Sequence, residues 1–114
     1  MSPEEQLRIA TRQGADRLIL ELQGELDMAS SAVLQAALAE ANDKESSTVV
    51  LDLRGVSFLD STGLKAIFKA RKAVCERGQQ FAVTPGSAQV QRLLSLTGLD
   101  EHLLTIDSPD ALLA

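Results

Sequence analysis

The run Asp60-Ser61-Thr62-Gly63 is the part of this sequence whose residue types and spacing could do chemistry. It follows an apolar run at residues 48–53 and opens a long amphipathic segment, which predicts a strand, a tight loop and a helix in that order. The first turn of such a helix presents free backbone N–H groups and the positive end of the helix dipole, and both favour a phosphate. The pattern therefore predicts a phosphoryl group on Ser61. It leaves open whether the chain is an enzyme, a nucleotide-binding protein or a kinase substrate.

The sequence offers little machinery for catalysis. A serine nucleophile needs an activating base, and the one histidine, His102, lies far along the chain in a segment that we interpret as surface. The second glycine of a hydrolase nucleophile elbow and the Gly-Lys-Ser/Thr phosphate loop are both missing. The remaining metal ligands are carboxylates without metal-loop spacing: Glu25, Asp27, Asp52 and Asp60. We therefore predict no catalytic residue, no metal and no cofactor.

The composition is that of one globular domain covering residues 1–114. Hydrophobic residues make up 45% of the chain and charged residues 24%. The net charge of −5 argues against a nucleic-acid partner or an anionic lipid surface, both of which select basic proteins. No apolar run is long enough for membrane insertion, residues 1–5 do not read as a signal peptide, and the single Cys75 cannot form an intramolecular disulfide. These features predict a cytoplasmic protein.

The flanking sequence alternates between strand-like and helix-like segments. Two apolar runs, residues 7–11 and 18–22, surround a Gly-containing turn and predict a hairpin. Asp27 is the predicted N-cap of the first helix. The later elements are a buried strand at 48–53, a strand at 80–84, a helix around Val90 and Leu94, an edge strand at 103–106 and a short helix from Ser108. The predicted fold class is α/β, with about four helices packed on a small mixed sheet of four to five strands.

The helix after the motif is the best-defined of these elements. Positions that recur at three- and four-residue steps predict the face that packs on the sheet: Leu64, Ile67, Phe68, Arg71, Val74 and Cys75. Cys75 is accordingly predicted to lie in the core. The opposite face is predicted to be solvated and carries Lys65, Lys69, Lys72 and Glu76, and Gly78 is the expected residue after the C-cap.

Three segments resemble, in order and spacing, the STAS domain of the anti-sigma factor antagonists. They are Gly24-Glu25-Leu26-Asp27, the run from Val50 through Asp60-Ser61-Thr62-Gly63-Leu64, and the run from Leu93 to Leu99. The resemblance covers roughly Leu7 to Leu113 and implies a STAS-like fold. It further implies that an anti-sigma factor with serine kinase activity phosphorylates Ser61. The unphosphorylated form would bind that kinase and free its sigma factor, and a PP2C-type phosphatase would reset the switch.

The resemblance also implies two groups of site residues. The phosphosite loop and helix N-terminus comprise Asp60, Thr62, Gly63, Leu64 and Lys65. The partner-binding residues are expected to be Glu25, Asp27, Met28, Asp52, Ser57 and Phe58. Family members often carry a small residue, commonly glycine, where Lys65 stands here. This difference bears either on which kinase fits or on whether the pathway controls a sigma factor at all.

Each of these residues also has a purely structural interpretation. Ser61 and Thr62 are common helix-capping types, or Asp60 is the N-cap and Ser61 the first helical residue. Gly63 permits a close approach of the helix to a neighbouring element. The same fold serves as a small subunit of ABC-type lipid transporters, so a non-phosphorylated adaptor is the main alternative function. A nucleotide-sensing domain that uses the same helix N-terminus is the third.

Overall fold

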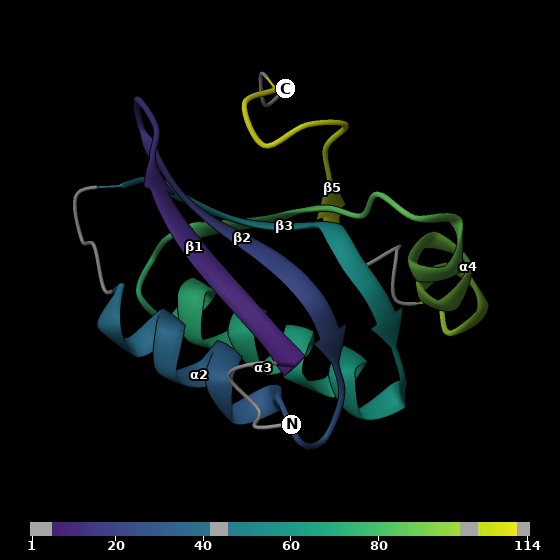
Figure 1. Cartoon of the computed structure of the whole chain (residues 1–114). Coiled ribbons are helices and arrows are strands. Elements are labelled where there is room, and N and C mark those ends of the chain that lie inside the picture. Colours follow the sequence, from purple (N-terminus) through teal and green to yellow (C-terminus); the bar gives the residue numbers. More distant parts are fainter. Residues whose placement is uncertain (1–5, 42–45, 99–102, 112–114) are drawn as a thin grey trace.

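Five strands form one mixed sheet in the computed structural model, which describes residues 6–41, 46–98 and 103–111 (Figure 1). In spatial order they are β1 (Leu7–Gln13), β2 (Arg17–Leu26), β3 (Thr48–Leu59), β4 (Gln80–Thr84) and β5 (Leu104–Thr105). β1 pairs antiparallel with β2, and every other neighbouring pair is parallel. The predicted hairpin and the predicted mixed sheet are therefore confirmed.

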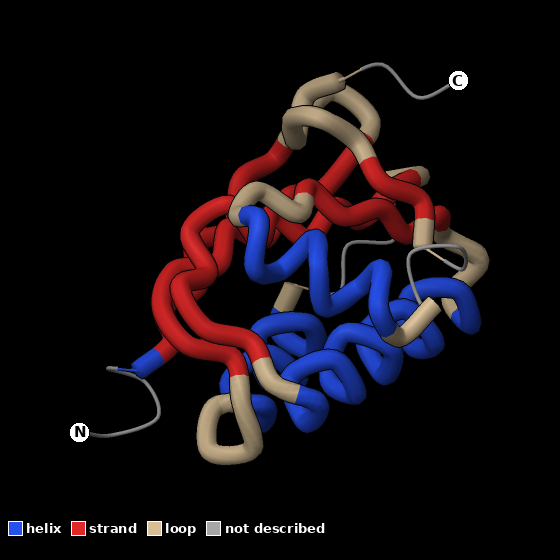
Figure 2. Tube along the Cα trace, turned by 90° about the vertical axis from the view of Figure 1, so that its right-hand side faces the viewer, coloured by secondary structure: helices blue, strands red, loops and turns tan. Residues whose placement is uncertain are grey.

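Two helices cover one face of this sheet. They are α2 (Ser31–Glu40) and α3 (Ser61–Glu76), while α4 (Ala88–Leu96) packs against β3 (Figures 1 and 2). The C-terminal segment crosses the opposite face, where Ile106 packs with Ile19, Val50 and Ala82. The larger core lies between the sheet and the helices, and β3 contributes to both sides, as expected for a buried central strand.

The short helix predicted from Ser108 does not begin within the described residues. Residues 108–111 form a turn, in which Ala111 N donates to Ser108 O at 3.1 Å. Arg17 Nη1 donates to the carbonyl oxygens of Pro109 and Ala111 at 2.8 and 2.9 Å. Because the arginine holds these carbonyls, the segment is fastened to the sheet as a turn.

β3 is longer than the apolar run that predicted it. It continues from Leu53 to Leu59 and bulges twice, with one extra β3 residue between Glu21 and Gln23 of β2 and another between Gly24 and Glu25. The loop before α3 is therefore one residue, Asp60.

Asp27 is not the N-cap of α2, which corrects the prediction. The helix begins four residues later, at Ser31, with Ser30 as its N-cap. Asp27 instead closes the turn before the helix, because its Oδ1 accepts hydrogen bonds from Ala29 N at 3.0 Å and from Ser30 N at 3.2 Å.

The packed face of α3 is rotated from the one predicted. Its buried residues are Gly63, Leu64, Ala66, Ile67, Ala70 and Val74. Arg71 and Cys75 are exposed, so the placement of Cys75 in the core was wrong. The reason is that α3 packs on α2 as well as on the sheet, and Ala66 and Ala70 extend its buried arc. The solvated lysine face and Gly78, at φ +79°, are as predicted.

Candidate functional site

The N-terminus of α3 is capped by Asp60. This residue has extended backbone angles, φ −114° and ψ −173°, and its Oδ1 accepts a hydrogen bond from Gly63 N at 2.8 Å. The Asp60 carbonyl accepts the first helical bond, from Leu64 N at 3.0 Å. Of the alternatives left open by the sequence, Asp60 is therefore the cap and Ser61 is the first helical residue.

Ser61 is consequently available for chemistry. Its side chain is exposed, and its hydroxyl forms no hydrogen bond within the described part of the chain. Thr62, the next residue, is half-buried. The one histidine, His102, lies outside the described residues. The Ser61 hydroxyl is therefore accessible from outside, at a helix end that stabilises negative charge.

The absence of a side chain at Gly63 lets the first turn of α3 pack directly against the end of β2. A Cβ at this position would collide with the Leu26 carbonyl and lie 2.6 Å from Leu59 Cδ1. The interpretation of Gly63 as a close-approach residue is confirmed. Leu64 is 3% exposed and belongs to the core, so its side chain anchors the first turn of α3 to the core. Lys65 is exposed on the outer side of the same turn.

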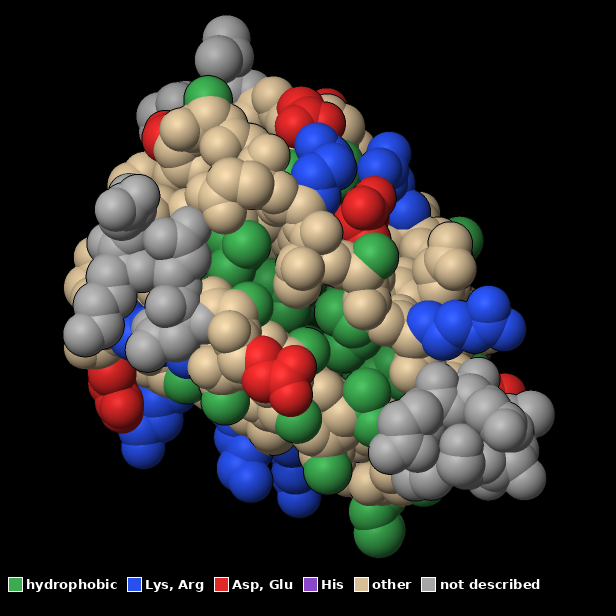
Figure 3. Space-filling view, turned by 60° about the vertical axis from the view of Figure 1, so that its left-hand side comes forward, with side chains coloured by type: hydrophobic (Ala, Val, Ile, Leu, Met, Phe, Trp, Pro, Cys, Tyr) green, Lys and Arg blue, Asp and Glu red, His purple; other side chains and the backbone are tan. Residues whose placement is uncertain are grey.

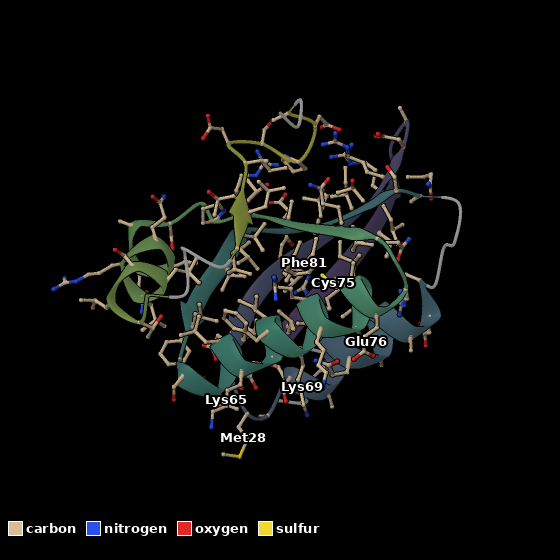
Figure 4. All side chains as sticks on the ribbon, turned by 180° about the vertical axis from the view of Figure 1, so that it is seen from behind. Met28, Lys65, Lys69, Cys75, Glu76 and Phe81 are labelled. Atoms are coloured by element: carbon tan, nitrogen blue, oxygen red, sulfur yellow. The ribbon has the colours of Figure 1, made fainter. Side chains whose placement is uncertain are left out.

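Most of the expected partner-binding residues gather near this helix end. The C-terminal ends of β2 and β3 lie side by side, with Glu25 opposite Phe58 and Leu26 opposite Leu59. Met28 follows in the next turn and is 74% exposed, and Phe58 is 41% exposed. Met28 and Lys65 project at the same end of the molecule (Figure 4). The result is a surface with exposed apolar side chains beside an exposed serine.

Two further residues fix the backbone of this surface. Ser57 Oγ donates to Gly24 O at 3.2 Å, across the second bulge. Asp27 Oδ2 accepts from Gln6 Nε2 at 2.6 Å. Their side chains therefore hold the strand ends and the Met28 turn in place.

Ser30 is a site residue that the sequence reasoning missed. It is fully buried, its Oγ donates to Glu25 O at 2.7 Å and accepts from Asp27 N at 3.0 Å. These bonds shape the turn that presents Met28. The Ser30-Ser31 pair could have indicated the start of the helix, but the sequence pattern led to Asp27 as the predicted N-cap.

Asp52 is separate from this cluster. It is 5% exposed and lies seven residues before Leu59, about 23 Å along an extended strand. Its side chain is on the sheet face opposite α3, together with Val50. There it accepts hydrogen bonds from Arg54 Nε and Nη2, both at 3.0 Å.

A basic groove begins at the phosphosite end and runs between α2 and α3. Its volume is about 720 Å³, and its lining includes Gln35, Ala66 and the exposed lysines of α3. Lys65, Lys69 and Lys72 form no ion pair within the described residues (Figure 4 labels the first two). This positive surface stands out on a chain of net charge −5.

Comparison with known proteins decides the family. The sequence pattern of the STAS domain matches residues 6–111. The chain belongs to the STAS domain family. A curated relative, the anti-sigma F factor antagonist of Paenibacillus polymyxa, is 35% identical over 83 residues, which are 72% of this chain and 71% of the relative. The resemblance to anti-sigma factor antagonists noted from three sequence segments is thereby confirmed.

Solved structures of STAS proteins agree with the fold. A putative anti-sigma factor antagonist from Thermotoga maritima superposes with a TM-score of 0.78 at 26% identity, covering 89% of this chain and 87% of that one. An anti-sigma factor antagonist from Mycobacterium paratuberculosis superposes with a TM-score of 0.77 at 24% identity, covering 96% and 93%. Within the described residues, no helix has the length and apolar character needed to cross a bilayer.

Proposed function

We propose that the unphosphorylated chain binds an anti-sigma factor that is also a serine kinase, and that phosphorylation of Ser61 releases it. The observation that carries the proposal is the exposed, unbonded Ser61 hydroxyl, which stands at the first position of α3 near exposed Met28 and Phe58. The curated relatives are named as antagonists of anti-sigma factors, which supports the same partner class.

The proposed switch acts on the partner surface and leaves the fold in place. A phosphate on Ser61 adds a charge of about −1.5 to −2. The helix dipole and free N–H groups stabilise that charge, and Lys65 lies at the i+4 position. For the bound kinase, the same charge must be desolvated beside apolar side chains such as Met28. A hundredfold loss of affinity requires only about 2.7 kcal/mol.

In this scheme the chain is an interaction protein and not an enzyme. The kinase supplies the nucleotide, the metal ion and the base that a phosphoryl transfer needs, so Ser61 requires none of these from its own chain. The chain works in the cytoplasm with its kinase, and a PP2C-type phosphatase returns Ser61 to the free hydroxyl.

Phosphorylation by a purified anti-sigma kinase from the same host tests the proposal. Intact mass and phosphopeptide mapping should find one phosphate, on Ser61. Ser61→Ala should accept none and retain the circular dichroism and melting temperature of the wild type. Thr62→Ala should still be phosphorylated, which separates the two neighbouring hydroxyls. A phosphate on Thr62 with Ser61 unmodified would contradict the assignment.

Kinase affinity provides the second arm. Ser61→Asp should weaken binding by tenfold or more, because it places a charge in the interface. Ser87→Asp is the matched control: it adds the same charge at the N-cap of α4, where aspartate also caps. Wild-type affinity of Ser61→Asp would refute the electrostatic switch. Absence of phosphate on the wild type, with recovery of a transporter ATPase in a pull-down, would favour the adaptor alternative.

A further inference from the structure

The outer edge of β1 is an open strand edge beside an apolar groove. β1 is the first strand of the sheet, and within the described residues only β2 pairs with it. Between β1 and α2 lies a groove of about 630 Å³, whose lining includes Leu7, Ile9, Ala32, Val33 and Ala36. Figure 3 brings this side of the molecule forward and shows apolar side chains gathered in a hollow. Strand edges of this kind template pairing with another strand.

The hairpin fixes which backbone groups face outward. Gly14 N donates to Arg17 O at 2.8 Å, and the β1–β2 register continues without a shift from Gln13↔Leu18 to Leu7↔Gly24. In an antiparallel ladder, hydrogen-bonded and non-hydrogen-bonded pairs alternate. Counting from the Gly14–Arg17 bond, the residues whose N–H and C=O groups point away from β2 are the odd-numbered ones, including Ile9 and Thr11.

We propose that β1 pairs antiparallel with β1 of a second copy of this chain, about a two-fold axis at Ile9. Ile9 then faces its own copy, and Leu7 faces the second copy's Thr11. All of these residues carry outward backbone groups, so each pair exchanges two hydrogen bonds. The contact is isologous, because an antiparallel strand pair about a two-fold axis repeats the same contacts in both copies.

Charge complementarity supports this register and this occupant. Arg8 has no ion pair within the described residues. In the proposed dimer Arg8 stands opposite the second copy's Ala10, whose register neighbour on β2 is Glu21. The Glu21 side chain is 38% exposed, and its ion pair with Arg12 within the same chain is long, at 3.8 Å, so its carboxylate remains accessible to a second cation. To reach the second copy's Glu21, the Arg8 side chain extends over the small Ala10 side chain of that copy. The distance between the two strands that carry Arg8 and Glu21 is about 10 Å, or two strand spacings. A two-fold axis at Ala10 would instead place Arg8 opposite Arg12, which like charges disfavour.

The groove and α2 fit the same arrangement. Side chains of odd-numbered β1 residues point to the helix face, since Leu7 and Ile9 belong to that core. The second copy's Ile9 therefore enters the hollow beside Ile9 and Val33. Ala32 and Ala36 are exposed on α2, and their small side chains leave room for the neighbouring copy. The contact uses no residue of α3, so it is independent of the proposed role of Ser61.

Sedimentation equilibrium across a concentration series tests the proposal. The wild type should be a concentration-dependent dimer. Arg8→Glu should raise the dimer dissociation constant about tenfold or more, because two ion pairs become two repulsions. The double variant Arg8→Glu/Glu21→Arg should restore dimerisation. Arg92→Glu, the same charge reversal on exposed α4, is the matched control and should leave the dimer unchanged.

Hydrogen exchange identifies the strand that pairs. The Ile9 and Thr11 amides should be protected in wild type at high concentration and should lose that protection in Arg8→Glu. A chain that is monomeric at every concentration overturns the proposal and leaves this edge to an extended segment of another protein. A dimer whose dissociation constant is unchanged by Arg8→Glu, and in which the Ile9 amide is not protected, also overturns the proposal, since another face then makes the contact.

Discussion

The Asp60 carboxylate accepts a hydrogen bond from Gly63 N at 2.8 Å, and this single bond separates two roles that the motif could have combined. Capping is done by the aspartate, so the hydroxyl of Ser61 is not required for it. Here the cap and the acceptor are neighbours, and modification of one leaves the other in place.

Removal of the Asp60 cap should lower stability without touching Ser61. Asp60→Ala leaves Gly63 N without its acceptor and should cost about 1 kcal/mol of unfolding free energy. Urea denaturation followed by circular dichroism measures the change. Asp60→Asn is the matched control, since asparagine caps about as well as aspartate. If both variants lose the same amount, the hydrogen-bonded cap is not the source of the effect.

Gly63→Ala should destabilise the protein even though alanine is the better helix former. The intrinsic preference favours alanine by about 1 kcal/mol. The added Cβ would collide with the Leu26 carbonyl and lie 2.6 Å from Leu59 Cδ1, so α3 must move away from the strand ends. We expect a net loss of about 1–3 kcal/mol in urea unfolding. Lys65→Ala, on the exposed side of the same turn, should change stability by less than about 0.5 kcal/mol. A more stable Gly63→Ala would contradict the close approach.

Phosphorylation of Ser61 should leave the fold at least as stable as before. The phosphate sits at the first helical position, where the dipole contributes about 0.3–1 kcal/mol to the binding of negative charge. Scanning calorimetry of the phosphorylated and unphosphorylated chains should therefore give an equal or higher melting temperature for the phosphoprotein. The gain should shrink in high salt. A melting temperature lowered by several degrees would mean that the switch works by partial unfolding and not through the surface.

The sequence pattern identified the elements and their order because each carries its own periodicity. The two apolar runs of the hairpin, the run beginning at Thr48 and the turn at Gly78 all depend on local preferences. The extension of β3 to Leu59 was not visible, because Arg54, Gly55 and Ser57 interrupt the apolar alternation at the two bulges. Bulges add residues to a strand without continuing its pattern.

The candidate site was predictable at Ser61 and less so around it. The motif identified the acceptor, but the choice of Asp60 as cap needed backbone angles. Asp52 was expected on the partner surface from the family resemblance, yet strand alternation places its side chain on the opposite face of the sheet. Cys75 was predicted to be buried because the periodicity of apolar residues indicates which face of α3 packs inward. It does not indicate that α3 also packs on α2, which turns a different face of the helix inward.

The exposed Cys75 gives a direct chemical check of that rotation. A thiol on the surface of α3 should react completely with Ellman's reagent in the native protein, without denaturant. Cys75→Ser should alter the unfolding free energy by less than about 0.5 kcal/mol, as expected for an exposed position. Reaction only after addition of urea would return this residue to the core and would contradict the orientation of α3.

The contact between Arg12 and Asp110 should make the C-terminal segment sensitive to acid. Arg12 Nη1 and Nη2 lie 3.1 and 3.2 Å from the two Asp110 oxygens, and the Arg12 hydrogen bond lowers the pKa of Asp110 below its ordinary value. Because the folded pKa is the lower one, the contact stabilises the protein fully above about pH 4 and is lost as the pH falls through the folded pKa. The difference in urea midpoint between wild type and Asp110→Asn should therefore be present at pH 7 and disappear towards about pH 2. Both side chains are largely exposed, so 1 M salt should also reduce it. A difference that is the same at both pH values would show that the carboxylate charge is not what holds the segment to the sheet.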